Sequence, residues 1–340
     1  MRLVMLLVVL CLGGCAKDLT GKEPTTHESF AEPKITYLGV GGWLLKWKGE
    51  ELLFAPSFSN PSFPPILVAA NHKRIDDYMP KTKNVTVLLI GHSHYDHLLD
   101  VPVIMQKYTP NATAYGPVTA GHILAAESLT SRFVDMEAKM IPVERDGHAV
   151  PVVVRSNDER WEPNGHFRFL AIQSQHAPHF AGIDFLPGDY DHEVLRTLPK
   201  TVFGWREGTT MAWLVDLLDD DYKTVIYRIH YQDSASNPPY GFPPILPDNK
   251  GVDVEIICAA STDQVELYPE ALLKITKPQK LLIGHWEDFF GNDPHHPQLL
   301  RAQKGETPLF DRLKKQYPEG QVVAPYPLTD VALPPLPKQE

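Results

Sequence analysis

The sequence predicts a mixed α/β (α+β) fold in which two β-sheets pack together and helices cover their outer faces. Short apolar runs typical of strands come first, from Ile35 onward, and glycine-containing turns separate them. Further strand-like runs then alternate with helical segments toward the C-terminus. With 340 residues, of which 43% are hydrophobic, the chain is long enough to bury the core that two packed sheets need.

The expected strands follow from apolar runs bounded by turn residues. Three come early and read as a meander of paired strands, because glycines and a Lys-Gly-Glu turn separate them. An unbroken apolar run at 85–90 is typical of a strand buried on both faces. The full set of expected strands is 35–38, 42–47, 51–54, 85–90, 150–154, 167–172, 211–217, 223–229, 252–257 and 280–283.

Three helices are expected, at residues 118–133, 268–278 and 307–317. In the second, Pro269 stands where a first helical turn tolerates proline. In the third, Thr307 is the expected N-cap and Pro308 the first helical residue. The order of strands and helices predicts one domain.

The first fifteen residues have the pattern of a secretory signal peptide, with a positive start, an apolar stretch and then small residues. The stretch Leu12-Gly13-Gly14-Cys15 resembles the lipobox of bacterial lipoproteins, in which cleavage leaves the cysteine as a lipidated N-terminus. The resemblance implies a lipid anchor on Cys15 and a place in the bacterial cell envelope, facing the periplasm or the outside. Ala16 is not the aspartate that retains lipoproteins in the inner membrane, which favours the outer membrane.

The rest of the chain divides by composition. Residues 16–33 are polar and without periodicity, so we expect a flexible tether, followed by one domain at 34–326 and a Pro-rich tail at 327–340. Sequence-independent binding of nucleic acid phosphates requires a basic surface, and the net charge of the chain is −10. We therefore expect no nucleic acid partner.

Residues 91–100 hold three histidines and two aspartates directly after the apolar run at 85–90. The pattern is His92-x-His94-x-Asp96-His97. Imidazole and carboxylate groups suit zinc, manganese or iron. In an extended chain residues two apart point the same way, so His92 and His94 can reach one ion. Asp96 and His97 are adjacent and need a turn, which allows them to face a second ion.

This motif after an apolar strand resembles the signature of the metallo-β-lactamase superfamily. The resemblance implies an αββα four-layer sandwich with a metal centre at one edge of the sheets. It also implies two divalent metal ions, for which zinc is expected and manganese or iron are alternatives.

The resemblance implies further ligands later in the chain. After the strand at 167–172, "QSQHAPHFAG" is similar to a Gln-His-Trp-Ser stretch of the N-acyl-phosphatidylethanolamine phospholipase D and lactonase-like branch. This favours His176 as the ligand, with His179 as the alternative. Asp233, at the end of the strand run "KTVIYRIHYQ", corresponds to the bridging aspartate, and His285 in "GHWEDFF" to the late histidine.

Two positions depart from the family pattern. Ala55 stands where the family has an aspartate that supports the site, and Gln232 replaces the glycine before the bridging aspartate. Losing a supporting residue weakens metal affinity or activity in many metal sites. Neither change removes a ligand.

The expected function is therefore metal-dependent hydrolysis of an ester, lactone or phosphodiester by a metal-bound hydroxide, with Asp96 placed to accept or relay a proton. Pro- and aromatic-rich loops at 55–73 and 230–250 could wall a pocket for an amphiphilic, lipid-like or small-molecule substrate near the membrane. One alternative is a metal-binding lipoprotein without catalysis, and another is a di-iron oxidoreductase.

Overall fold

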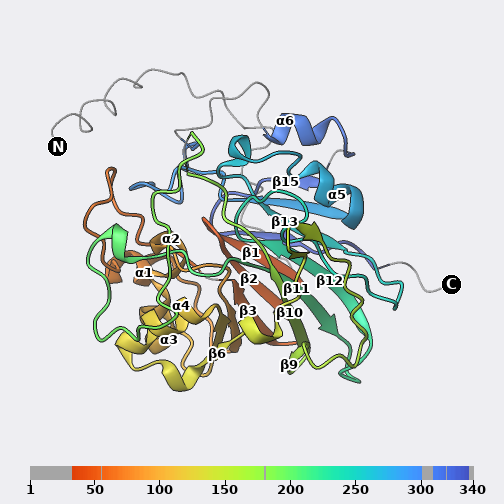
Figure 1. The fold of residues 1–340 in the computed structure, drawn as a ribbon, viewed down its shortest axis with the longest axis horizontal. Coiled ribbons are helices and arrows are strands. Elements are labelled where there is room, and N and C mark those ends of the chain that lie inside the picture. The colour runs from red at the N-terminus through yellow and green to blue at the C-terminus, as the bar shows by residue number, and fades with distance from the viewer. Residues whose placement is uncertain (1–32, 55, 180, 301–308, 319, 337–340) are drawn as a thin grey trace.

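The structure, a computed structural model, describes residues 33–54, 56–179, 181–300, 309–318 and 320–336. Two seven-stranded sheets pack against each other, with helices on their outer sides (Figure 1). The predicted mixed α/β fold with two packed sheets is confirmed.

The first sheet has the strand order β16-β1-β2-β3-β4-β5-β6, and the second has the order β15-β14-β13-β12-β11-β10-β9. The strands of the first sheet are β1 (Lys34–Gly39), β2 (Gly42–Trp47), β3 (Glu50–Phe54), β4 (Val85–Leu89), β5 (Thr113–Gly116), β6 (Phe133–Asp135) and β16 (Thr329–Ala332). Those of the second are β9 (Glu162–Asn164), β10 (Phe167–Gln173), β11 (Met211–Leu218), β12 (Val225–Gln232), β13 (Val254–Cys258), β14 (Lys280–Gly284) and β15 (Val322–Val323). A small separate hairpin contains β7 (Glu144–Arg145) and β8 (His148–Ala149).

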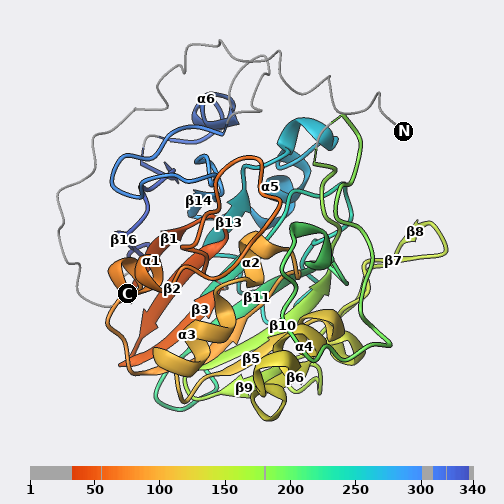
Figure 2. The same cartoon turned by 90° about the vertical axis from the view of Figure 1, so that its left-hand side faces the viewer.

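The α-helices form the outer layers. Four of them lie in front of the first sheet in Figure 2, and two lie beside the second sheet. They are α1 (His72–Tyr78), α2 (Tyr95–Leu98), α3 (Val101–Lys107) and α4 (Val118–Leu124), then α5 (Glu270–Thr276) and α6 (Leu309–Lys314). Short 3-10 helices lie at Ala125–Glu127, Thr130–Arg132, Glu137–Lys139, Val202–Gly204 and Thr262–Gln264.

Strand alternation explains the layers. In β2, Trp43 and Leu45 face the second sheet and join a core that includes Phe169 and Trp213. Leu44 lies between them in sequence and points to the opposite face, where it packs with the helices. Both faces of the first sheet are therefore buried, which is why its strands are apolar without strict alternation. The outer face at β10 and β11 is covered by irregular chain instead of a helix.

Three expected elements differ in the structure. The helix expected at 118–133 ends at Leu124, and Ser128 then adopts a left-handed backbone, so the chain continues as 3-10 helices and β6. Residues 150–154 form no strand, only a bridge from Val153 to Ile245, and Pro151 has no N–H to donate to a ladder. The third helix begins at Leu309 within the described residues, while its expected cap residues Thr307 and Pro308 lie outside them.

The predicted boundary between the domain and a Pro-rich tail at residue 327 differs from the structure. Thr329–Ala332 is β16, which pairs antiparallel with β1 at the edge of the first sheet. Asp330 accepts hydrogen bonds from Lys34 Nζ and Thr36 Oγ1, each at 2.6 Å. The domain therefore extends past residue 326. Residues 337–340 lie outside the described part of the chain.

The signal peptide expected at 1–15, with Cys15, and the tether at 16–33, apart from Pro33, also lie outside the described residues. Within the described ranges, none of the helices is long and apolar enough to cross a bilayer.

Candidate metal centre

The histidine-rich motif lies where predicted, directly after a buried strand. β4 ends at Leu89 and α2 begins at Tyr95, so His92 and His94 lie in the short connection between the two elements, where His94 has extended backbone. The side chains of His92, His94 and His97 are buried, and the side chain of Asp96 is 13% exposed. The loop thus points its imidazoles into the protein and not into solvent.

Three more expected residues reach the same place from the second sheet. His176 follows β10, Asp233 follows β12 directly, and His285 follows β14 directly. The side chains that follow these strands contact the side chains that follow β4. The ends of the four strands therefore meet at one edge of the two sheets.

These seven residues form two groups that share the Asp233 carboxylate. In the first, the rings of His92, His94 and His176 have centroids 4.6–4.8 Å apart. The second contains Asp96, His97 and His285. Within each group the candidate ligand atoms all lie within 4.8 Å of one another, which is close enough for one ion per group.

Asp233 lies between the groups. Its Oδ2 is 2.7 Å from His92 Nδ1, and its Oδ1 is 3.0 Å from His97 Nδ1. On the other side, Asp96 Oδ2 is 3.5 Å from His97 Nε2 and 3.4 Å from His285 Nε2. A carboxylate with one oxygen toward each group is the arrangement that a bridging ligand requires.

His179, the alternative to His176, has other partners. Its Nδ1 is 3.1 Å from Asp184 Oδ1 and accepts a hydrogen bond from the Phe185 N–H at 3.3 Å. It forms another possible ligand group with His94 and Asp184, and the side chain of Asp184 is 33% exposed. The structure therefore brings His176 together with His92 and His94, and places His179 at the margin of that group.

The protonation states favour metal binding. Burial lowers the pKa of His92, His94 and His176, which keeps their imidazoles neutral. Burial disfavours the charged form of Asp96 and Asp233, but the surrounding histidines together outweigh it and hold the pKa of both well below the usual range. These histidines are His97, His285 and His94 around Asp96, and His97 and His92 around Asp233. Neutral imidazoles and ionised carboxylates are the forms that bind metals.

Two further observations fit an ion in this cluster. Burial opposes a charge on His97, yet Asp233 and Asp96 raise its pKa to about 9, so the two carboxylates attract positive charge. The buried Nε2 of His92 has no hydrogen-bond partner among the described residues, and a buried nitrogen without a partner is costly. The residues therefore fit divalent ions.

Glycines allow the cluster to pack closely. A Cβ on Gly41 would lie 2.7 Å from His97 Nδ1 and 2.8 Å from Asp233 Oδ1, and a Cβ on Gly91 would collide with the Asp233 carboxylate. Asp233 thus fits into a cradle of bare backbone. The hydroxyl of Tyr231, on β12, lies within hydrogen-bonding distance of Asp233 Oδ1 and of the Gly41 carbonyl oxygen.

Two buried carboxylates that no motif in the sequence marks support the cluster. Asp100 accepts hydrogen bonds from the N–H groups of Phe58 and Ser59 at 2.6 and 2.8 Å, which fixes the loop after β3. Glu287 accepts hydrogen bonds from the Tyr37 hydroxyl and the Val40 N–H at 2.6 and 2.7 Å. Asp100 lies three residues after the motif at 92–97 and Glu287 lies two residues after His285. This closeness in sequence is the feature that could have marked them as supporting residues.

The two departures from the family pattern have different outcomes. Ala55 itself lies outside the described residues, and Asp100 holds the loop that follows it. Gln232 is buried, and its Nε2 donates to Ser236 Oγ at 3.3 Å and to the Tyr240 carbonyl oxygen at 3.2 Å. It therefore fixes the loop after β12 without contributing a ligand.

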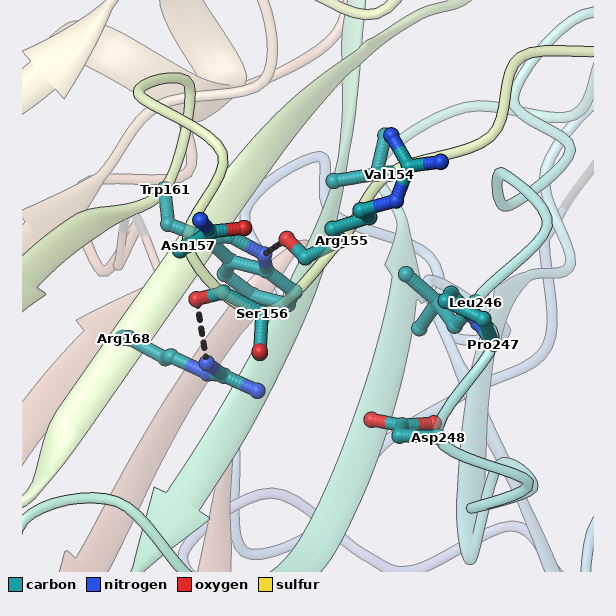
Figure 3. Close-up of a pocket in the computed structure, with 9 residues that line it drawn as sticks. All are labelled: Val154, Arg155, Ser156, Asn157, Trp161, Arg168, Leu246, Pro247 and Asp248. Atoms are coloured by element: carbon teal, nitrogen blue, oxygen red, sulfur yellow. Dashed lines mark hydrogen bonds between the residues drawn. The ribbon is translucent and has the colours of Figure 1, made fainter.

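A separate cavity of about 220 Å³ lies on the outer face of the second sheet (Figure 3). Arg168, near the start of β10, lines it, whereas His176 lies beyond the other end of the same strand at Gln173, which is about 17 Å from Arg168 at about 3.3 Å per residue. Leu246, Pro247 and Asp248 line it too, so this part of the loop expected to wall the metal site lies elsewhere.

No protein-family model and no curated protein sequence matches this chain. Solved structures are similar in fold. The isothiocyanate hydrolase from Delia radicum gut bacteria has a TM-score of 0.50 at 9% identity, over 88% of this chain and 99% of that one. The metallo-β-lactamase fold protein YhfI from Bacillus subtilis has a TM-score of 0.45 at 14% identity, over 88% and 98%. CmlA, a diiron β-hydroxylase from Streptomyces venezuelae, has a TM-score of 0.49 at 14% identity, over 89% and 55%.

At these identities the similarity concerns the fold alone. The two packed sheets, the outer helices and the histidine cluster at one edge of the sheets confirm the αββα four-layer sandwich that the sequence resemblance implies.

Proposed function

We propose that this protein is a metal-dependent hydrolase with a two-ion centre. The observation that carries the proposal is the pair of His/Asp groups on either side of Asp233. His92, His94 and His176 would hold one ion, Asp96, His97 and His285 would hold the other, and Asp233 would contact both. Zinc is the expected metal, because imidazole and carboxylate ligands suit it, with manganese and iron as alternatives.

Bound divalent ions would supply Lewis acidity, which lowers the pKa of water and polarises a carbonyl or phosphoryl oxygen. Asp96 is the catalytic residue of this proposal. Its side chain is 13% exposed, compared with 1% for Asp233, so it lies nearer the opening of the cluster. There it would accept the proton released when water attacks and pass it to the leaving group.

The proposed substrate is an ester, lactone or phosphodiester with an amphiphilic character. The lipobox-like stretch at Cys15 supports this, because a lipid anchor would hold the domain near the surface of the cell envelope, where amphiphiles concentrate. No nucleic acid partner is proposed, given the net charge of −10.

The experiment that tests the proposed function replaces one histidine of the first group. His94→Ala should lower the metal content found by elemental analysis and reduce hydrolysis of chromogenic esters, lactones and phosphodiesters by roughly a hundredfold or more, about 3 kcal/mol in the barrier. The fold, followed by circular dichroism, should be retained. The matched control is His148→Ala, which changes an exposed histidine on the β7–β8 hairpin.

Unchanged metal stoichiometry in His94→Ala would contradict the assignment of the site. Full metal loading of the wild-type protein without turnover of any substrate class would instead favour a metal-binding protein without catalysis.

A further inference from the structure

A row of phenylalanine rings leads from the metal centre to the surface. The ring of Phe289 lies 4.9 Å from the His285 ring, centroid to centroid, and 4.5 Å from the ring of Phe290. Phe290 in turn lies 5.2 Å from the ring of Phe63. We call Phe289, Phe290 and Phe63 the aromatic ledge. It begins at a candidate ligand and ends at a side chain that belongs to a different loop.

The outer part of the ledge is open to solvent. Phe63 is 50% exposed, and Phe289 and Phe290 are half-buried. Exposed aromatic surface is unfavourable in water, and apolar surface that adjoins a polar site is typical of ligand-binding regions. The ledge therefore offers an apolar contact beside the second group of candidate ligands.

Polar contacts hold the two loops of the ledge together. Asn60 Nδ2 donates to Asn292 Oδ1 at 2.6 Å, and the Gly291 N–H donates to the Asn60 carbonyl oxygen at 3.0 Å. Arg74 donates to the carbonyl oxygens of Phe58 and Asn292, one in each loop, at 2.6 and 2.8 Å. Because these bonds fix the loops before a ligand binds, the ledge is pre-organised, which reduces the entropy lost on binding.

We propose that the aromatic ledge binds a linear hydrocarbon chain of the substrate, with the scissile group at Asp96 and His285. This proposal rests on the proposed function, and it adds an orientation: the acyl chain leaves the centre on the His285 side. Beside the other group of candidate ligands, the exposed ring of Phe185 lies 5.8 Å from the His179 ring, and among the described residues no row of further rings continues from it.

The first test measures kcat/KM for p-nitrophenyl esters from acetate to decanoate, using the zinc-loaded full chain. Each methylene buried on the ledge should raise kcat/KM by up to about fourfold. Phe63→Ser and Phe290→Ser should each lower the ratio of decanoate to acetate turnover. Phe185→Ser is the matched control, because it removes an equally exposed ring on the other side, and it should keep the wild-type ratio.

A second test does not depend on turnover. Calorimetry compares binding of decanoate and acetate to the zinc-loaded wild type and to Phe63→Ser. Decanoate should bind at least tenfold more tightly than acetate to the wild type, and the preference should shrink in the variant.

Two results would overturn the ledge. One is an equal response to every chain length in the wild type, in turnover and in binding. The other is loss of chain-length preference in Phe185→Ser while Phe63→Ser and Phe290→Ser keep it. If no ester is hydrolysed but decanoate still binds through Phe63, the proposed hydrolysis fails and the ledge stands.

Discussion

His176 and His179 are three residues apart on one loop, and both rings lie near His94, but their other partners differ. His176 packs against the rings of His92 and His94, and its pKa is lowered strongly by burial. His179 is directed at Asp184. The imidazole of His176 therefore completes the group with His92 and His94, whereas the imidazole of His179 lies at the margin of that group, beside Asp184.

This difference predicts opposite effects of two substitutions. His176→Ala should lose at least one of the bound ions, because it removes one of three histidines in its group. His179→Ala should retain both ions. Metal content by elemental analysis and binding competition with a chromogenic chelator measure the difference, and the reverse pattern would show that His179 is the ligand.

Tyr231 is a positioning residue for Asp233. Its buried hydroxyl lies against Asp233 Oδ1 and the Gly41 carbonyl oxygen, and its ring stacks on Phe54 with centroids 4.3 Å apart. The cradle formed by Gly41 and Gly91 restricts Asp233 on other sides. The hydroxyl therefore helps to set which way the carboxylate oxygens point.

Tyr231→Phe should weaken zinc binding by roughly ten- to a hundredfold, the usual effect of losing a hydrogen bond to a metal ligand. The visible spectrum of the cobalt-substituted protein should change as well, because it reports ligand geometry. Tyr227→Phe is the control, since Tyr227 is on the same strand but donates to the Pro334 carbonyl oxygen. Equal zinc affinity and equal cobalt spectra in both variants would contradict the role of Tyr231.

At the scale of the elements, three neighbouring strands carry a buried charge cluster. Arg168 on β10 and Arg228 on β12 lie directly opposite Asp216 on β11, which is fully buried between them. Asp216 accepts hydrogen bonds from Arg168 Nε at 2.9 Å and from Arg228 Nε at 2.6 Å. The cluster links the three strands at a distance from the candidate metal centre, which lies at the other end of β10.

Asp216→Asn should destabilise the protein by about 3–5 kcal/mol, because it leaves two guanidinium groups without their shared carboxylate. Urea unfolding followed by circular dichroism measures the loss. Asp219→Asn should have little effect, because Asp219 is on the surface, where its pairing with Lys48 is screened by solvent. A similar midpoint for both variants would show that the cluster does not stabilise the sheet.

At the scale of the whole molecule, the proposed lipid anchor would decide where the proposed hydrolase acts. Cys15→Ser should move the protein from the membrane fraction to a soluble or uncleaved form. Stable anchoring needs more than one acyl chain, because a single chain binds a bilayer only marginally. Fractionation and mass spectrometry of the N-terminus test this, and a wild-type protein without lipid would contradict the lipobox interpretation.

Local patterns in the sequence were enough for much of the fold. β1 to β4 and β10 to β14 lie where apolar runs bounded by turn residues placed them. The motif at 92–97 follows its strand as expected, since its residues are covalent neighbours and their positions depend on local backbone geometry.

Only the tertiary structure decided contacts between distant segments. β16 has no strong apolar pattern. It forms because it pairs with β1, the edge strand that lies almost 300 residues earlier in the chain. In the same way, the distinction between His176 and His179, the contact of Tyr231 with Asp233 and the row of rings from His285 to Phe63 depend on which loops the sheets bring together. Local sequence determines which secondary structure each segment can form. Packing of the whole chain determines which segments come into contact. Contacts between distant segments require long loops to close, and no short stretch of sequence specifies that closure.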